Sequence, residues 1–404
     1  MIIPPARRTE SVQEYYFSRK LKEIAEINKR KAAEGQASVI NLGIGAPDGM
    51  PPADAILALT ESARRKDTHA YQSYVGIEEL RKAFAAWYLR YYGVELDPAG
   101  EIQPLVGSKE GILLTALAFL NEGDGVLVPD PGYPTYTSAS LLTQARIIRY
   151  DLREDNGWKP DFAALERTDL SGVKLMWVNY PHMPTGASAS PGLYREIVDF
   201  ALRHRILVVN DNPYSFILND QPLSILATPG AKECCLELNS LSKAHNMSGW
   251  RIGMIAGDKE LVAQVLKVKS QMDSGMFKPL QLAAVEALKQ GPEWFRELNA
   301  VYARRKVLAG AIFDLLGVRY DPASSGLFLW GRVSDDNPYA ALTPSGEKSL
   351  GERVSDTVLY RSGVFITPGF IFGKNGENYI RISLCAKEEV LIQARKQIAG
   401  ILNN

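Results

Sequence analysis

Cysteine, histidine and net charge are all scarce in this sequence of 404 residues. Its three cysteines are Cys234, Cys235 and Cys385, an odd number with two adjacent, which gives no disulfide framework and indicates a reducing compartment. The four histidines form neither an HExxH pair nor a Cys/His cluster, so we expect no metal site. Lys+Arg and Asp+Glu both number 46, and this neutral balance provides no basic field for nucleic acid or an anionic membrane.

Long hydrophobic runs are also missing. The longest lies near 112–120, far short of a membrane span, and residues 1–8 lack the apolar stretch of a signal peptide. We therefore expect a cytoplasmic protein with no membrane or nucleic-acid partner. Hydrophobic residues make up 46% and charged residues 23%, as in ordinary globular proteins, and the length predicts two domains or one with an appendage.

Short apolar, β-rich runs alternate with helical stretches in the middle of the chain. This rhythm predicts an α/β fold, a mainly parallel sheet flanked by helices on both faces. Residues 293–316 are expected to form one long helix, after which strands and a closing helix indicate a smaller α+β domain. We predict an N-terminal arm and small-domain segment at 1–48, a large domain at 49–290 and a small C-terminal domain at 291–404.

The most informative segment is Asn239-Ser-Leu-Ser-Lys-Ala-His-Asn-Met-Ser-Gly-Trp-Arg-Ile-Gly253. Lys243 follows an apolar strand pattern, at the kind of strand end where α/β sheets bind ligands. A nucleophilic lysine must lose its proton, which burial beside another cation such as Arg251 favours. Ser240, Ser242 and Arg251 are donors of the kind that a phosphate monoester needs. A lysine after a strand is by itself most often a surface residue, so the inference depends on the whole segment.

This segment resembles the cofactor-lysine signature of the class I/II aminotransferases, which are pyridoxal-phosphate enzymes of fold type I. The shared pattern is Ser-x-Ser-Lys followed eight residues later by Arg, and further motifs in family order extend the resemblance from 43–48 to 379–383. The resemblance implies that Lys243 holds pyridoxal 5'-phosphate as a Schiff base and acts as general acid and base. The expected reaction moves an amino group from an amino acid to a 2-oxo acid, with 2-oxoglutarate as the expected acceptor.

Two tyrosines and an aspartate are placed by the same resemblance. Asp211 follows the apolar run 206–210, where a carboxylate can keep the cofactor's pyridine nitrogen protonated. Tyr214 resembles the tyrosine that donates to the cofactor's phenolic oxygen, and Tyr133 resembles the aromatic residue that stacks on its ring. Without this context, Asp211 would be a strand-to-turn residue and the tyrosines would be packed in turns.

Gly107-Ser-Lys-Glu-Gly111 precedes an apolar helical stretch. A helix N-terminus offers free N–H groups to an anion, and by resemblance Ser108 and Lys109 bind the cofactor phosphate. The alternative is a plain strand-to-helix turn with Ser108 as the N-cap.

Three further residues are expected at the substrate or at a second subunit. Arg381 resembles the arginine that clamps the substrate's α-carboxylate, and Gly45 resembles the glycine beside the substrate. Tyr71 resembles a tyrosine that reaches the phosphate of the partner subunit, which implies a homodimer with shared active sites. The charged helical stretch 11–34 is expected to be solvated or packed in the dimer.

One position departs from the family. Met183 stands where the family has the asparagine of Asn-Pro-Thr-Gly, which hydrogen-bonds the cofactor's phenolic oxygen. Methionine cannot donate, so His182 or Asn179 replaces it or Tyr214 is left as the main donor. The lost hydrogen bond should raise the pKa of the Schiff base.

Alternatives on the same scaffold are a β-eliminating carbon–sulfur lyase or a decarboxylase, because the cofactor performs the hard chemistry in each. A cofactor-binding transcriptional regulator is disfavoured, since about 35 residues before the Gly/Pro-rich loop are too few for a DNA-binding domain. Aspartate, alanine and diaminopimelate-type amino donors all stay open. Lys278 is a candidate for binding a distal carboxylate of the substrate, either within its own chain or in a partner.

Overall fold

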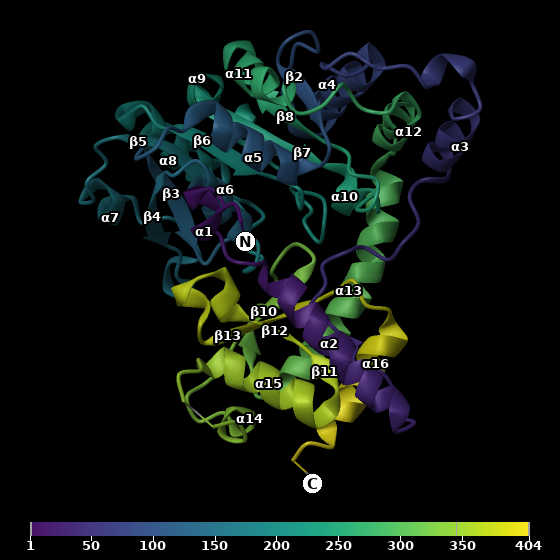
Figure 1. Cartoon of the computed structure of the whole chain (residues 1–404), viewed down its shortest axis with the longest axis vertical. Helices are drawn as coiled ribbons and strands as arrows, with labels where there is room; N and C mark the ends of the chain where they lie inside the picture. The colour runs from purple at the N-terminus through teal and green to yellow at the C-terminus, as the bar shows by residue number, and fades with distance from the viewer. Residues whose placement is uncertain (1, 345, 403–404) are drawn as a thin grey trace.

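The computed structural model describes residues 2–344 and 346–402, so the outer ends of the first and last predicted domains lie outside the described residues. Figure 1 shows two lobes, each built around its own sheet. The long helix α13 (Pro292–Leu315) begins beside the larger lobe and extends into the smaller one. No helix within the described part of the chain is long and apolar enough to cross a membrane.

A seven-stranded sheet forms the larger lobe, with strand order β2-β8-β7-β6-β5-β3-β4. Neighbours from β7 to β4 pair in parallel, and only β8 runs against its two neighbours. The predicted α/β fold with a mainly parallel sheet is therefore confirmed. The strands are β2 (Ile102–Leu105), β3 (Gly125–Asp130), β4 (Arg146–Asp151), β5 (Val173–Val178), β6 (Leu207–Asp211), β7 (Cys235–Ser240) and β8 (Gly253–Gly257).

Helices cover both faces of this sheet, which explains why β3, β7 and β8 are buried along their whole length. Successive strand residues point to opposite faces. Val126 and Val128 accordingly belong to one core cluster and Leu127 to another. The first cluster includes α5 (Ser108–Phe119), α6 (Pro134–Leu142) and α11 (Lys259–Lys269), and the second includes α4 (Glu78–Tyr92), α8 (Pro191–His204) and α12 (Lys278–Leu288).

The smaller lobe is built from segments near both ends of the described chain. Its antiparallel sheet has the order β12-β13-β10-β9, while β1 (Ile40–Asn41) pairs in parallel with β11 (Val364–Phe365). Ile24 of the N-terminal helix α2 (Tyr16–Ala33) packs with Leu359 and Phe365. The other elements here are β9 (Arg319–Tyr320), β10 (Phe328–Arg332), β12 (Thr367–Pro368), β13 (Tyr379–Ser383), α14 (Pro338–Ala341), α15 (Leu350–Ser362) and α16 (Glu388–Ala399).

Short helices complete the chain between these elements. They are α1 (Arg7–Glu10), α3 (Ala53–Ser62), α7 (Phe162–Glu166), α9 (Ala231–Cys234), α10 (Leu241–Ala244) and the 3-10 turns Lys66–Thr68, Glu154–Asn156, Ile225–Ala227, Gly369–Phe372 and Lys374–Gly376.

The carboxyl ends of the central strands carry polar residues. Asp211 ends β6 and Ser240 ends β7, while Asn179 directly follows β5. Lys243 lies in α10, immediately after β7. This edge of the sheet is where open α/β folds bind ligands, and it positions the site described next.

Candidate active site

A cavity of about 420 Å³ lies at this edge of the sheet and reaches the smaller lobe. Its wall includes every predicted site residue except Tyr71 and Lys278, namely Gly45, Ser108, Lys109, Tyr133, Asp211, Tyr214, Ser240, Ser242, Lys243, Arg251 and Arg381. The sequence motifs therefore converge on one place, although they are spread over more than 300 residues of the chain.

Lys243 lies partly buried within the cavity wall. Its Nζ donates a hydrogen bond to the carbonyl oxygen of Gly45 at 2.7 Å. Burial lowers the pKa of Lys243, and the charges of Arg251 and Arg381 lower it further. The lowered pKa makes the neutral amine, which is the nucleophilic form of a lysine, easier to reach.

Asp211 presents an unpaired carboxylate oxygen at the same cavity. Its side chain is buried, and Oδ2 accepts a hydrogen bond from the Tyr136 hydroxyl at 2.9 Å. Oδ1 is buried with no partner among the described residues. Burial raises the pKa of Asp211 to about 6. A buried acceptor without a partner is costly, so this oxygen is suited to a ligand that brings a donor or a positive charge.

The loop before α5 forms an anion cradle with the residues after β7. Gly107 is the N-cap of α5 with φ +79°, so Ser108 is the first helical residue and the alternative of Ser108 as N-cap is wrong. A Cβ atom at Gly107 would collide with the Arg251 guanidinium, so glycine lets that arginine lie against the loop. Arg251 Nη1 donates to Ser242 Oγ at 3.3 Å, and the Ser240 hydroxyl donates to the same oxygen at 2.8 Å. A helix N-terminus, hydroxyls and a guanidinium together fit a phosphate dianion.

Lys109, in the first turn of α5, lies beside two aromatic rings. Its ammonium lies 4.8 Å from the ring centroid of Tyr15 and 5.9 Å from that of Tyr133. Both rings line the cavity, so cation–π contacts with them hold the Lys109 ammonium beside the site.

Arg381 is a buried cation without a carboxylate partner among the described residues. Its exposed fraction is 4%. Nη2 donates to the Gly43 carbonyl at 2.8 Å, Nη1 contacts the Met183 sulfur at 3.3 Å, and Nε has no partner in the described chain. The guanidinium lies 3.9 Å from the ring centroid of Phe328 and 4.7 Å from that of Phe372.

Burial lowers the pKa of Arg381 to about 10. An uncompensated buried charge is unfavourable, and a guanidinium binds a carboxylate through two parallel hydrogen bonds. The geometry around Arg381 is therefore suited to receiving a carboxylate from outside the chain.

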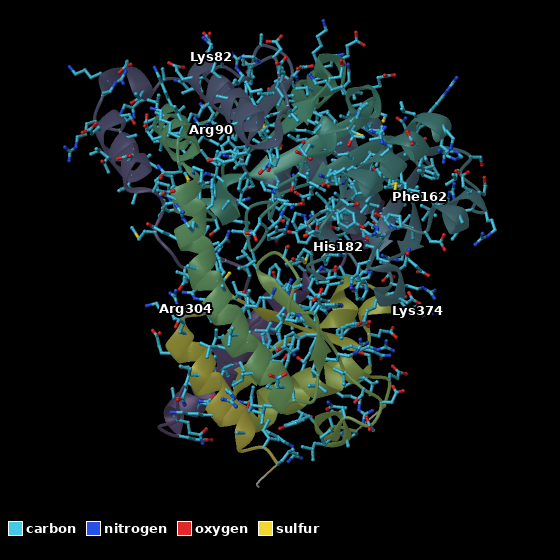
Figure 2. All side chains as sticks on the ribbon, turned by 180° about the vertical axis from the view of Figure 1, so that it is seen from behind. Lys82, Arg90, Phe162, His182, Arg304 and Lys374 are labelled. Atoms are coloured by element: carbon cyan, nitrogen blue, oxygen red, sulfur yellow. The ribbon has the colours of Figure 1, made fainter. Side chains whose placement is uncertain are left out.

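The structure excludes one neighbour of Met183, His182, as a hydrogen-bond donor into the cavity. Asn179 Nδ2 already donates to the Asp211 carbonyl, and its Oδ1 accepts from the Met183 N–H at 2.8 Å. His182 does not line the cavity; its Nδ1 lies 2.8 Å from Thr185 Oγ1, and burial lowers its pKa to about 3. Figure 2 shows His182 in the interior, at the level where the two lobes meet. Asn179, whose amide carries a second N–H, and Tyr214 both line the cavity and are the candidate donors on this side.

Two predicted residues lie elsewhere. Tyr71 is 91% exposed and outside the cavity, and Lys278 forms an ion pair with Asp67 at 3.5 Å. Neither side chain lines the cavity of its own chain.

Several cavity residues were not predicted. They are Tyr15, Phe17, Leu21, Ile44, Tyr136, Pro213, Ser248, Phe328 and Phe372. The start of α2 also lines the cavity, a role that was not expected for the helical stretch 11–34, while its packing in a dimer stays a prediction. Aromatic residues at helix or strand spacing look like core residues in a sequence, whereas Ser248, Ile44 and Pro213 lie inside or between motif residues and so had a local signal.

The fold and the site together are characteristic of the aminotransferases of fold type I. Residues 37–398 match the family described as aminotransferase class I and II, and the chain belongs to this family. The predicted family, amino-group transfer and transaminase class are therefore confirmed. Membership of this family implies a pyridoxal-phosphate enzyme.

Known relatives extend over nearly the whole chain. The LL-diaminopimelate aminotransferase of Dehalococcoides mccartyi is 38% identical over 98% of this chain and 98% of its own. That of Aquifex aeolicus is 37% identical over 96% and 99%. The substrate-bound BacF structure from Bacillus subtilis is 32% identical with a TM-score of 0.89, covering 99% of this chain and 98% of its own. A probable N-succinyldiaminopimelate aminotransferase from Thermus thermophilus is 32% identical with a TM-score of 0.83, covering 94% and 99%.

Proposed function

We propose that this aminotransferase binds pyridoxal 5'-phosphate covalently through Lys243 Nζ and uses the cavity around that lysine to transfer an amino group from an amino acid to a 2-oxo acid. The observation that carries the proposal is the convergence of three incomplete groups. A lysine with a lowered pKa, an aspartate oxygen without a donor and a buried arginine without a carboxylate line the same cavity in the described chain.

The residues present fit this cofactor. The unpaired Oδ1 of Asp211 would hold a protonated pyridine nitrogen, and its raised pKa falls once a positive charge lies beside it. The cradle of Gly107 and Arg251, with Ser108, Lys109, Ser240 and Ser242, would hold the phosphate. Tyr133 would stack on the ring and Tyr214 would donate to the phenolic oxygen. When bound, pyridoxal phosphate supplies a ring that accepts the electron pair released as the substrate Cα–H bond breaks.

The chain's own residues orient the substrate and move its proton. Arg381 binds the α-carboxylate through its two-pronged face, close to Gly45, and so fixes the substrate Cα relative to Lys243. Lys243 Nζ, released when the amino substrate takes its place on the cofactor, would take the proton from the substrate Cα and deliver it to the cofactor's C4′ carbon. The rings of Phe17, Phe328 and Phe372 around Arg381 exclude water from this ion pair.

The same proposal includes a homodimer with shared active sites, because Tyr71 projects 91% exposed from its own chain. It also includes the domain division at 1–48, 49–290 and 291–404, which agrees with a seven-stranded sheet in one lobe and the four- and two-stranded sheets in the other. A cytoplasmic location is proposed as well, and it agrees with three free cysteines. For the amino donor we propose a diaminopimelate-type amino acid, because relatives 38% identical are LL-diaminopimelate aminotransferases. Lys278 of a partner subunit is the proposed contact for its distal carboxylate.

Replacing the lysine tests the proposal. Lys243→Ala should abolish the absorption of covalently bound cofactor and remove transaminase turnover, because the variant has no amine to which the cofactor could attach. Arg251→Lys serves as the comparison, since it weakens phosphate binding and leaves the covalent attachment. Full turnover by Lys243→Ala would refute the mechanism. Amino donors offered with 2-oxoglutarate, including aspartate, alanine and LL-diaminopimelate, identify the substrate, while release of ammonia and pyruvate instead would indicate the lyase alternative.

A further inference from the structure

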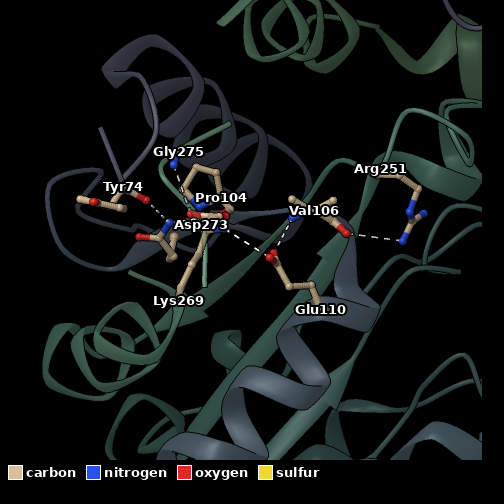
Figure 3. A network of polar contacts seen from close by, with 9 residues as sticks. Tyr74, Pro104, Val106, Glu110, Arg251, Lys269, Asp273 and Gly275 are labelled. Carbon is tan, nitrogen blue, oxygen red and sulfur yellow. Dashed lines mark hydrogen bonds and ion pairs between the residues drawn. The ribbon is translucent and has the colours of Figure 1, made fainter. Parts of the chain in front are cut away.

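Lys269, at the end of α11, is a fully buried lysine outside the cavity. Its ammonium lies 3.3 Å from Glu110 Oε1 and forms a closer ion pair with Asp273. A buried charge is tolerated only where it is paired, and removal of one partner leaves the others uncompensated. Lys269 therefore fixes the positions of both carboxylates. Figure 3 shows this network from close by.

Each carboxylate uses its second oxygen on the backbone of a different loop. Glu110 Oε2 accepts from the Val106 N–H at 2.6 Å, and the Val106 carbonyl accepts from Arg251 Nη2 at 3.5 Å. Asp273 Oδ1 accepts from the Gly275 N–H at 3.2 Å. One ammonium thus holds the loop that forms the anion cradle and also the turn between α11 and α12 (Figure 3).

The α11–α12 turn in turn contacts the segment that carries Tyr71. Gly275 has φ +89°, and a Cβ atom there would lie 2.5 Å from the Gln72 carbonyl oxygen. Gln103, beside the cradle loop, donates to the Tyr74 carbonyl at 2.9 Å. The segment 71–76 therefore bonds to Gln103 of β2, the strand before the cradle loop, on one side. On the other side it lies against Gly275 in the turn that Lys269 and Asp273 hold.

We propose that Lys269 is a positioning residue that holds the phosphate cradle of its own site in register with the segment 71–76, and so couples cofactor binding in one subunit to the surface that meets the second copy. This inference rests on the proposed function, since it requires pyridoxal phosphate in the cradle and Tyr71 at the partner. It assigns a role to Lys269, Glu110 and Asp273, which would contact neither the cofactor nor the second copy directly.

The test compares Lys269→Met with Lys267→Met, a matched change on the same helix. Lys267 is exposed, and its ammonium donates to Gln264 Oε1 at 2.9 Å and forms no ion pair within the described part of the chain. The Kd of the apoenzyme for pyridoxal phosphate should rise roughly tenfold in Lys269→Met and stay within about twofold of wild type in Lys267→Met. The concentration at which the dimer dissociates, measured by sedimentation, should rise in the same variant, while kcat at saturating cofactor changes little.

Glu110→Gln provides a second variant in case Lys269→Met does not fold, since the amide keeps the shape and an acceptor for Val106. Its Kd should rise less than that of Lys269→Met, and the double variant should show less than the product of the single effects, because both changes remove one interaction. A Kd within about twofold of Lys267→Met for both variants, or fully multiplicative effects, would overturn the proposal. A wild-type chain that binds no pyridoxal phosphate would instead overturn the proposed function on which it rests.

Discussion

Replacing Met183 by asparagine should make the cofactor-bearing nitrogen of Lys243 easier to deprotonate. In the wild type, His182 faces Thr185, and the proposed donors to the cofactor's phenolic oxygen are Tyr214 and the second N–H of the Asn179 amide, whose first N–H is bonded to the backbone. An asparagine at 183 would add a further donor. A phenolate that is better stabilised by donors opposes loss of the neighbouring proton less strongly.

The expected size follows from a single hydrogen bond. A hydrogen bond to a charged oxygen contributes about 1.5–3 kcal/mol, and one pKa unit corresponds to about 1.36 kcal/mol. The pKa should therefore fall by about 1 to 2 in Met183→Asn. Spectrophotometric pH titration of the bound cofactor measures it, with Met183→Leu as a control that adds no donor. An unchanged or higher pKa in the asparagine variant would refute the reasoning, as would an equal fall in the leucine variant.

The remaining predictions concern binding and pH. Arg381→Met should lower kcat/KM for the amino acid roughly 10²- to 10⁴-fold, from two charged hydrogen bonds at about 1.5–3 kcal/mol each, without lowering the urea midpoint, because the guanidinium has no carboxylate partner in the described chain; a strongly destabilised variant would show instead that Arg381 is structural. His245 is buried with both ring nitrogens unpartnered among the described residues, and burial lowers its pKa to about 3 from an ordinary value of 6.5. The unfolded chain therefore binds the extra proton between these pH values, so stability falls as the pH falls through them. Wild type should lose about 2 kcal/mol more unfolding free energy than His245→Phe between about pH 7 and pH 5, measured by urea denaturation, and equal losses would contradict the buried neutral ring.

The sequence predicted those site residues whose chemistry is unusual for their local context. Lys243 and Arg251 lie within 8 residues of each other among small polar residues, and Gly107 precedes a helix after a strand. The alternation of apolar runs predicted the sheet, because buried parallel strands need apolar residues on both faces. The reversed direction of β8 was not predicted, since strand direction depends on how a connection crosses the sheet and not on composition.

Residues such as Tyr136, Phe328 and Phe372 could not be found in this way. Each has the spacing of a core residue, and its role depends on which other element comes to face it. Phe328 and Phe372 flank a guanidinium whose partners are set by the fold, and Tyr136 donates to Asp211 from a neighbouring helix. Tyr71 is exposed in its own chain, so any role it has depends on a second subunit, which sequence spacing does not place.

The two lobes supply opposite ends of the site. Lys243 follows β7 of the large sheet, whereas Arg381 lies on β13 of the small one, among rings from the same lobe. An amino acid held at its nitrogen by one lobe and at its carboxylate by the other would bridge the two lobes. The ion pair between Arg381 and the substrate carboxylate would then help to set the distance between the lobes, although it lies away from the reacting bond. An amine without the carboxylate would not bridge the lobes in this way.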